Sequence, residues 1–126
     1  MDAQTFPVRQ YGGNRVVLTG SFRPNGSSHP SATHHKGKWF TVTRTGTGTY
    51  AVVLNDTVVD VEAVFVHLRL ATAADKEAQA GTYTTATRTL VISIWDKGDG
   101  SVSGDVASDA DNVISMEIVV RVGSDV

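Results

Sequence analysis

In several segments of this chain, apolar and polar side chains alternate from one residue to the next, and no other feature constrains its fold as strongly. The alternation is clearest in residues 36–56, "KGKWFTVTRTGTGTYAVVLND", where Phe40 and Val42 alternate with threonines and the run reverses at a Gly-Thr-Gly turn. Successive side chains of a strand point to opposite faces, so this pattern predicts a hairpin with one apolar and one threonine-rich face. We expect the threonine-rich face to be solvated or to pack on a neighbouring surface.

The same period of two recurs in residues 14–22, 61–71, 85–97 and 112–123. The apolar sets expected to face inward are Val64, Val66, Leu68 and Leu70; Leu90, Ile92 and Ile94; and Ile114, Met116, Ile118, Val120 and Val122. A slip of one residue would turn each set to water, so the register should be well defined. Six or seven short strands separated by turn signals predict an all-β fold, namely an antiparallel β-sandwich or a jelly-roll-like single domain.

The length of the chain sets its domain count. With 126 residues, the chain suffices for one core and is too short for two. Residues 1–13 show no periodicity and contain a Gly-Gly pair, so we expect an N-terminal arm ahead of a sandwich domain over residues 14–126. Phe6 and Tyr11 are unusual in such an arm, and they should pack either on the domain itself or on a partner.

Three further segments complete the predicted organisation. Residues 23–37 are dense in Pro, Gly, Ser, Asn and His and exceed the usual loop length, which makes them a candidate binding or assembly loop. Residues 71–83 are alanine-rich, and a helix of one or two turns is expected there. Residues 96–112 form an acidic, glycine-rich loop whose side chains either hold a cation weakly or bond nearby backbone groups in a solvated turn.

Charge is distributed unevenly along the chain. Residues 1–50 hold six basic groups and one acidic group, whereas residues 51–126 hold five basic and twelve acidic groups. The positive part could seat against an acidic surface, including that of another copy, or folding could mix the two signs over one surface.

Residues that usually carry chemistry form no catalytic pattern in this sequence. No GxSxG, HExxH or related motif occurs, so an enzyme is not expected. Three of the four histidines fall in the loop of residues 23–37 without a carboxylate at fixed spacing, so no metal or other cofactor is expected either. The chain has no cysteine, which excludes disulfides and thiolate metal sites.

Membrane and nucleic-acid partners are not expected. No apolar run approaches the roughly 20 residues of a membrane helix, and the N-terminus lacks the pattern of a secretory signal. The net charge of −2 argues against nucleic-acid binding, despite a faint hint from Trp39 and Phe40 beside Lys36 and Lys38.

Four stretches taken together resemble a known class of protein. They are "GSFRPNGSSHPS", "KGKWFTVTRTGTGTYAVVLND", "LRLATAADKEAQAGTY" and "VISIWDKGDGSVSGDVASDADNVISMEIVVR". Their combination, over about residues 20–122, resembles small virion proteins of tailed bacteriophages, of the head-decoration or cement type. The resemblance implies a protein that is made in the cytoplasm of the host bacterium, binds the outer surface of the major capsid shell, bridges capsid subunits and stabilises the shell. Such proteins are often homotrimers, and the resemblance brings no catalytic residue with it.

The contacts expected with the major capsid protein or with other copies are Phe6, Arg9, Tyr11, Arg23, His34, His35, Trp39, His67 and Arg69. Deleting residues 2–12 is expected to abolish particle binding and to leave the domain folded. The alternative function is a tail- or fibre-associated module that binds a receptor or a glycan. It requires a concave site lined by exposed aromatic side chains, for which Trp39 and Trp95 are candidates. Otherwise these two residues fill a second core face or a subunit interface.

Overall fold

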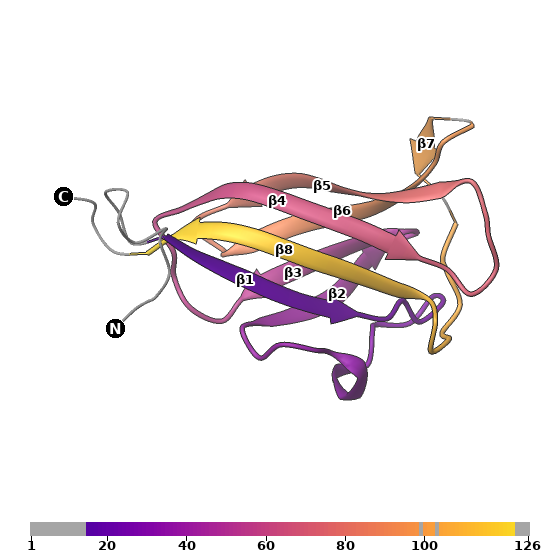
Figure 1. Ribbon diagram of the computed structural model, residues 1–126, viewed down its shortest axis with the longest axis horizontal. Helices are drawn as coiled ribbons and strands as arrows, with labels where there is room; N and C mark the ends of the chain where they lie inside the picture. The colour runs from indigo at the N-terminus through magenta and orange to yellow at the C-terminus, as the bar shows by residue number, and fades with distance from the viewer. Residues whose placement is uncertain (1–14, 99, 103, 123–126) are drawn as a thin grey trace.

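The protein is a sandwich of two antiparallel β-sheets. The computed structural model describes residues 15–98, 100–102 and 104–122, and Figure 1 shows its smaller sheet in front of the larger one. The smaller sheet has the strand order β1-β8-β4, formed by β1 (Arg15–Phe22), β8 (Val113–Arg121) and β4 (Asp60–Arg69). The predicted all-β sandwich is therefore confirmed, while the arm of residues 1–13 lies outside the described residues.

The larger sheet has five strands. Its central path is β2-β3-β6-β5, formed by β2 (Phe40–Gly46), β3 (Thr49–Leu54), β6 (Thr89–Asp96) and β5 (Lys76–Thr84). The short strand β7 (Ser101–Val102) pairs with the end of β6. All strand pairs in both sheets are antiparallel. Because successive side chains of a strand point to opposite faces, each strand presents alternate side chains to the space between the sheets.

The core lies between the two sheets and contains the side chains that the alternation assigned to it. Its buried apolar members are Phe22, Phe40, Val42, Tyr50, Val52, Leu54, Val58, Leu90, Ile92, Ile94, Val106, Ile114, Met116, Ile118 and Val120. Val64, Val66, Leu68, Leu70 and Val122 pack against this cluster and are partly buried. The inward sets predicted for the hairpin and for the three longer segments are thus confirmed, because only one register buries all of them together.

A helix over residues 71–83 was predicted, and this prediction is wrong. Residues 76–84 form β5, which pairs with β6 along the edge of the larger sheet. Ala78 stands opposite Ile94, and Ala80 stands opposite Ile92, so both alanines lie on the inward side of the strand. The hydrogen bonds offered by the exposed edge of β6 outweigh the modest helix propensity of a short alanine-rich segment.

Hydrogen bonds fasten the loop of residues 23–37 to the smaller sheet. Its 3₁₀ helix η2 (Ala32–His34) is capped by Ser31, whose hydroxyl oxygen accepts a bond from the Thr33 backbone N–H. Ser21 and Lys36 exchange two backbone hydrogen bonds of 2.9 Å, which place the end of the loop alongside β1. The loop is therefore built into the edge of the sandwich.

Hydrogen bonds to Asp105 attach the acidic loop of residues 96–112 to the β2–β3 turn. The Asp105 carboxylate accepts hydrogen bonds from Arg44 Nε at 2.9 Å, from Arg44 Nη2 at 2.7 Å and from the Gly48 backbone N–H at 2.9 Å. The hydrogen bond from Arg44, followed by the one from Gly48, lowers the pKa of Asp105 and keeps it ionised. Elsewhere in this loop, the Asp109 carboxylate accepts a hydrogen bond of 2.8 Å from the nearby Asp111 backbone N–H. A side chain that bonds nearby backbone is what the solvated-turn alternative for this loop predicts.

Candidate functional site

The outer face of the smaller sheet is the surface most suited to binding a partner. The pairing registers place its outward side chains in rows that run across β1, β8 and β4. One row is apolar and consists of Val17, Val119 and Ala63. The next consists of Thr19, Glu117 and Phe65, and the one after it of Ser21, Ser115 and His67. We call these three rows the outer face.

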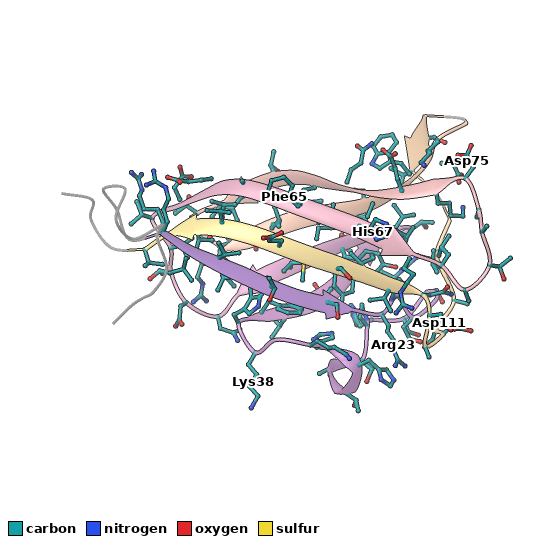
Figure 2. The ribbon with its side chains drawn as sticks, in the orientation of Figure 1. Arg23, Lys38, Phe65, His67, Asp75 and Asp111 are labelled. Carbon is teal, nitrogen blue, oxygen red and sulfur yellow. The ribbon has the colours of Figure 1, made fainter. Side chains whose placement is uncertain are left out.

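Phe65 is the most exposed large apolar side chain of the outer face, and Figure 2 shows it along β4 with His67. Its exposed fraction is 62%, and that of Val17 across the sheet is 42%. A phenylalanine that points away from the core contributes little to folding, and burying its remaining exposed surface against a partner would contribute about 1–2 kcal/mol. Together with Val119 and Ala63, these residues form a contiguous apolar strip on the sheet surface.

A shallow hollow of about 330 Å³ lies beside this strip. It is lined by Thr19, Phe65, Val66, His67, Ser115, Met116 and Glu117. Glu117 forms no ion pair with any residue in the described part of the chain. The hollow therefore combines an aromatic ring with an unpaired carboxylate and an imidazole, which favours a partner that carries both apolar and charged groups.

A second hollow, of about 220 Å³, is mainly basic and lies at the end toward which β1 and β4 run. It is lined by Ser21, Arg23, His34, Lys36, Arg69, Ala110, Val113 and Ser115. Figure 2 shows Arg23 and Asp111 at this end of the molecule. Arg69 Nη1 lies 3.2 Å from an Asp111 carboxylate oxygen, and both side chains are exposed, so water screens this pair strongly. Arg23 and Lys36 form no ion pair with any described residue, and the hollow keeps a positive balance.

The opposite end of the outer face carries a compact charged cluster. The Glu62 carboxylate accepts hydrogen bonds from Arg15 Nε and, at 3.3 Å, from Arg15 Nη2. Arg121 Nε lies 3.8 Å from the same carboxylate. The apolar strip is therefore flanked by charged groups at both ends, an arrangement typical of the apolar centre and polar rim of a protein interface.

The structure brings together four of the residues predicted as partner contacts. Arg23, His34 and Arg69 line the basic hollow, and His67 lies in the row beside it. Phe6, Arg9 and Tyr11 fall outside the described residues.

His35 and Trp39, also predicted as contacts, lie away from the outer face. The His35 ring stacks on Phe40 at a centroid distance of 5.3 Å and meets the edge of Phe22 at 6.4 Å. Burial, with a smaller effect from His34, lowers the pKa of His35, which favours the neutral ring. Trp39 packs against the core and donates a hydrogen bond of 2.8 Å from Nε1 to the Thr19 carbonyl.

Phe65, Val17, Glu117 and Lys36 were not among the predicted contacts. The signal for Phe65 was present, since the alternation of residues 61–71 already placed it opposite the inward valines. The alternation of residues 112–123 also placed Glu117 outward. Which residues lie near Glu117 and Lys36 could not be predicted, because that depends on which strands are neighbours.

A buried tyrosine, Tyr50, lies in β3 of the larger sheet. Its hydroxyl is buried and has no hydrogen-bond partner among the described residues. Burial, assisted by the charge of Asp105, raises the pKa of Tyr50 to about 12. A phenol with so high a pKa stays protonated at neutral pH, so this group contributes no charge and no base.

Two other features are absent from residues 15–98, 100–102 and 104–122. These residues contain no group of three or more His, Asp or Glu side chains placed to hold a metal ion. Within the same ranges, no helix has the length and apolar character needed to cross a membrane.

Comparison with known proteins returned no match to any family model, to any curated protein or to any solved structure.

Proposed function

We propose that this protein is a decoration or cement protein of a tailed-bacteriophage capsid, which binds the outer surface of the major capsid shell and stabilises it. The observation that carries the proposal is the outer face, where Phe65 and Val17 are exposed on a rigid sheet between two charged ends. The exposed side chains belong to a contiguous apolar strip on a regular sheet, and such a strip favours a partner that covers it. The resemblance of residues 20–122 to phage head-decoration proteins supplies the identity of that partner.

The outer face would bind through its apolar centre and gain specificity at its ends. Burying Phe65 would supply affinity, and the basic hollow around Arg23, Lys36 and Arg69 would select an acidic patch on the capsid protein. As a homotrimer, the protein would present three such faces at once, and avidity would convert modest single contacts into stable attachment. The sandwich itself would serve as a rigid spacer, since the outer face is built on paired strands.

A binding experiment with capsids tests this proposal. Expanded heads that lack the protein are mixed with the wild type or with the double variant Val17→Ser, Phe65→Ser, and bound protein is measured by co-sedimentation. Loss of the phenylalanine contact alone corresponds to a fall in affinity of about tenfold per site, since about 1–2 kcal/mol of burial is lost. The matched control is Val102→Ser, because Val102 is also 42% exposed but belongs to β7 on the other sheet. Equal binding by the double variant and the wild type would refute the assignment of the outer face.

A tail- or fibre-associated module that binds a glycan is the second candidate. The hollow that contains Phe65, His67 and Glu117 supports it, because an aromatic ring beside polar groups is suited to stacking on a sugar. Trp39 and Trp95, predicted for this role, are both partly buried, and Trp39 points into the end of the sandwich. Binding on a glycan array that disappears in Phe65→Ser, together with no binding to heads, would favour this function over the first.

The assembly state provides a further measurement. Light scattering after size exclusion gives the mass of the protein in solution, and a trimer is expected. The same measurement on the double variant shows whether the outer face joins copies or remains free for the shell.

A further inference from the structure

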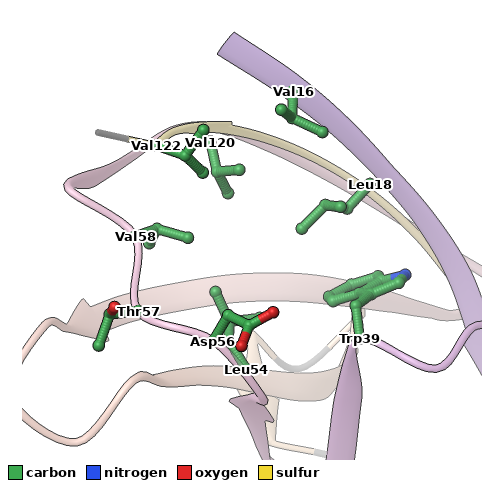
Figure 3. A pocket seen from close by; sticks show the side chains of 9 residues that line it. All are labelled: Val16, Leu18, Trp39, Leu54, Asp56, Thr57, Val58, Val120 and Val122. Atoms are coloured by element: carbon green, nitrogen blue, oxygen red, sulfur yellow. The ribbon is translucent and has the colours of Figure 1, made fainter. Parts of the chain in front are cut away.

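An apolar pocket opens at the end of the sandwich where β1 begins, and the functions proposed above do not use it. Its volume is about 110 Å³, of the same order as the roughly 150 Å³ apolar cavities that admit a benzene ring. The lining residues are Val16, Leu18, Trp39, Leu54, Asp56, Thr57, Val58, Val120 and Val122. Figure 3 shows that they converge from both sheets and from the segment that connects β3 to β4.

The pocket leaves apolar surface uncovered at one open end of the core. Val16 is 39% exposed although its side chain lies on the inward side of β1, and Leu18 and Trp39 are only partly buried. Trp39 is held in place by its hydrogen bond to the Thr19 carbonyl, so its ring forms a fixed wall of the pocket. An apolar side chain placed against this wall would remove part of the exposed area from water.

One charged side chain, Asp56, lies at the rim of the pocket. Asp56 lies beside Leu54 on the side opposite Val16 and Leu18. It forms no hydrogen bond or ion pair with any residue within 15–98, 100–102 and 104–122. An occupant that combines an apolar ring with a nearby cation would therefore complement both the lining and the rim.

We propose that the N-terminal arm of the same chain folds back and covers this pocket, with the ring of Tyr11 as its anchor and Arg9 near Asp56. Tyr11 precedes Val16 by five residues, so it stays within about 18 Å of the rim even in extended chain. Residues 12–14 are Gly-Gly-Asn, and these residue types favour a chain reversal. The arm would need such a reversal in order to return to the pocket beneath β1. Because Arg9 and Tyr11 are two residues apart in the sequence, an arm bound in extended form would direct both side chains to the same side.

Proximity favours the arm of the same chain over the arm of another copy as the occupant of the pocket. A segment joined to the rim by a few residues has an effective concentration in the millimolar range, which dilution does not change. Phe6 is the second aromatic residue of the arm and would add contact further along the pocket mouth. This arm contact does not depend on capsid binding.

Trp39 reports directly on the occupancy of the pocket. In a Trp95→Phe background, Trp39 is the remaining tryptophan, and its emission wavelength and acrylamide quenching are measured in the full chain. Tyr11→Ala, Phe6→Ala and a variant lacking residues 2–12 are expected to shift the emission to longer wavelength and to increase quenching. Far-UV circular dichroism checks that each variant stays folded. Phe65→Ala on the outer face and a variant lacking residues 123–126 are the matched controls and should leave both readouts unchanged.

Three results would overturn the proposal. Equal emission and quenching in the full chain, in Tyr11→Ala and in the variant lacking residues 2–12 would show that the arm does not reach Trp39. A shift caused by removing residues 123–126, with none caused by Tyr11→Ala, would assign the pocket to the C-terminal segment. Protection of Trp39 that disappears on dilution would assign the occupant to another copy of the chain.

Discussion

Gly20 is the position where the addition of a single methyl group should do most harm. It lies on the inward side of β1, opposite Met116. A Cβ at Gly20 would lie 2.6 Å from the Lys36 carbonyl oxygen and 2.8 Å from Phe40 Cε1. A carbon and a carbonyl oxygen normally stay about 3.3 Å or more apart. The methyl group of Gly20→Ala therefore requires a displacement of more than half an ångström.

The neighbours of Gly20 cannot yield cheaply. The Lys36 carbonyl accepts a backbone hydrogen bond of 2.9 Å from Ser21, and the Lys36 N–H donates a second bond of 2.9 Å to the Ser21 carbonyl. The Phe40 ring is buried and stacked on His35. We therefore expect Gly20→Ala to lower the free energy of unfolding by about 2 kcal/mol, the usual cost of overpacking. With a slope of about 2 kcal/mol per molar urea, the midpoint should fall by about 1 M.

Gly46→Ala is the matched control. Gly46 also lies in a strand, but a Cβ at this position would meet no atom within 4 Å. Replacing a strand glycine with alanine usually stabilises a protein by about 0.5 kcal/mol, because the unfolded chain loses conformational freedom. The two substitutions should thus have opposite signs in urea titrations followed by circular dichroism. A Gly20→Ala midpoint equal to that of the wild type, or an equal loss in Gly46→Ala, would refute the reasoning.

Three further predictions concern Tyr50, Asp105 and His35. Tyr50→Phe removes a buried hydroxyl without a partner among the described residues, so urea unfolding should show stability equal to or above wild type; a clear loss would reveal a hidden partner. The pKa of Asp105 is lowered in the folded state, so its contribution is present above its ordinary value of 3.8 and is lost as the pH falls through the folded value. Asp105→Asn should therefore be less stable at neutral pH and should lose less stability in acid, and parallel acid titrations of variant and wild type would contradict this. The pKa of His35 is also lowered, so the neutral ring stabilises the fold above 6.5 and stability should decline as the pH falls below that value. His35→Phe should lack this decline in unfolding measured against pH, and an unchanged profile would exclude His35 as its cause.

Alternation alone determined much of the core of this protein. Phe40 and Val42, and the inward sets of β4, β6 and β8, could be assigned because a strand with one buried face must repeat every second residue. The same rule placed Phe65 on the outside. It failed for residues 76–84, where Ala78 and Ala80 are too small to give a clear apolar signal. That segment is a strand because β6 offers it a free edge, which is a property of the sheet and not of the segment.

The assembly of the candidate surface was decided by the tertiary structure. Arg23, Lys36 and Arg69 come from a loop, a bridge beside β1 and the end of β4, and no local rule states that these three segments meet. Their proximity follows from the strand order β1-β8-β4, in which the C-terminal strand separates two strands from earlier in the chain. Local sequence determines which side of a strand a residue occupies, because that depends only on backbone geometry. Which residues share a surface depends on strand pairing between distant segments, which is set by the packing of the whole core.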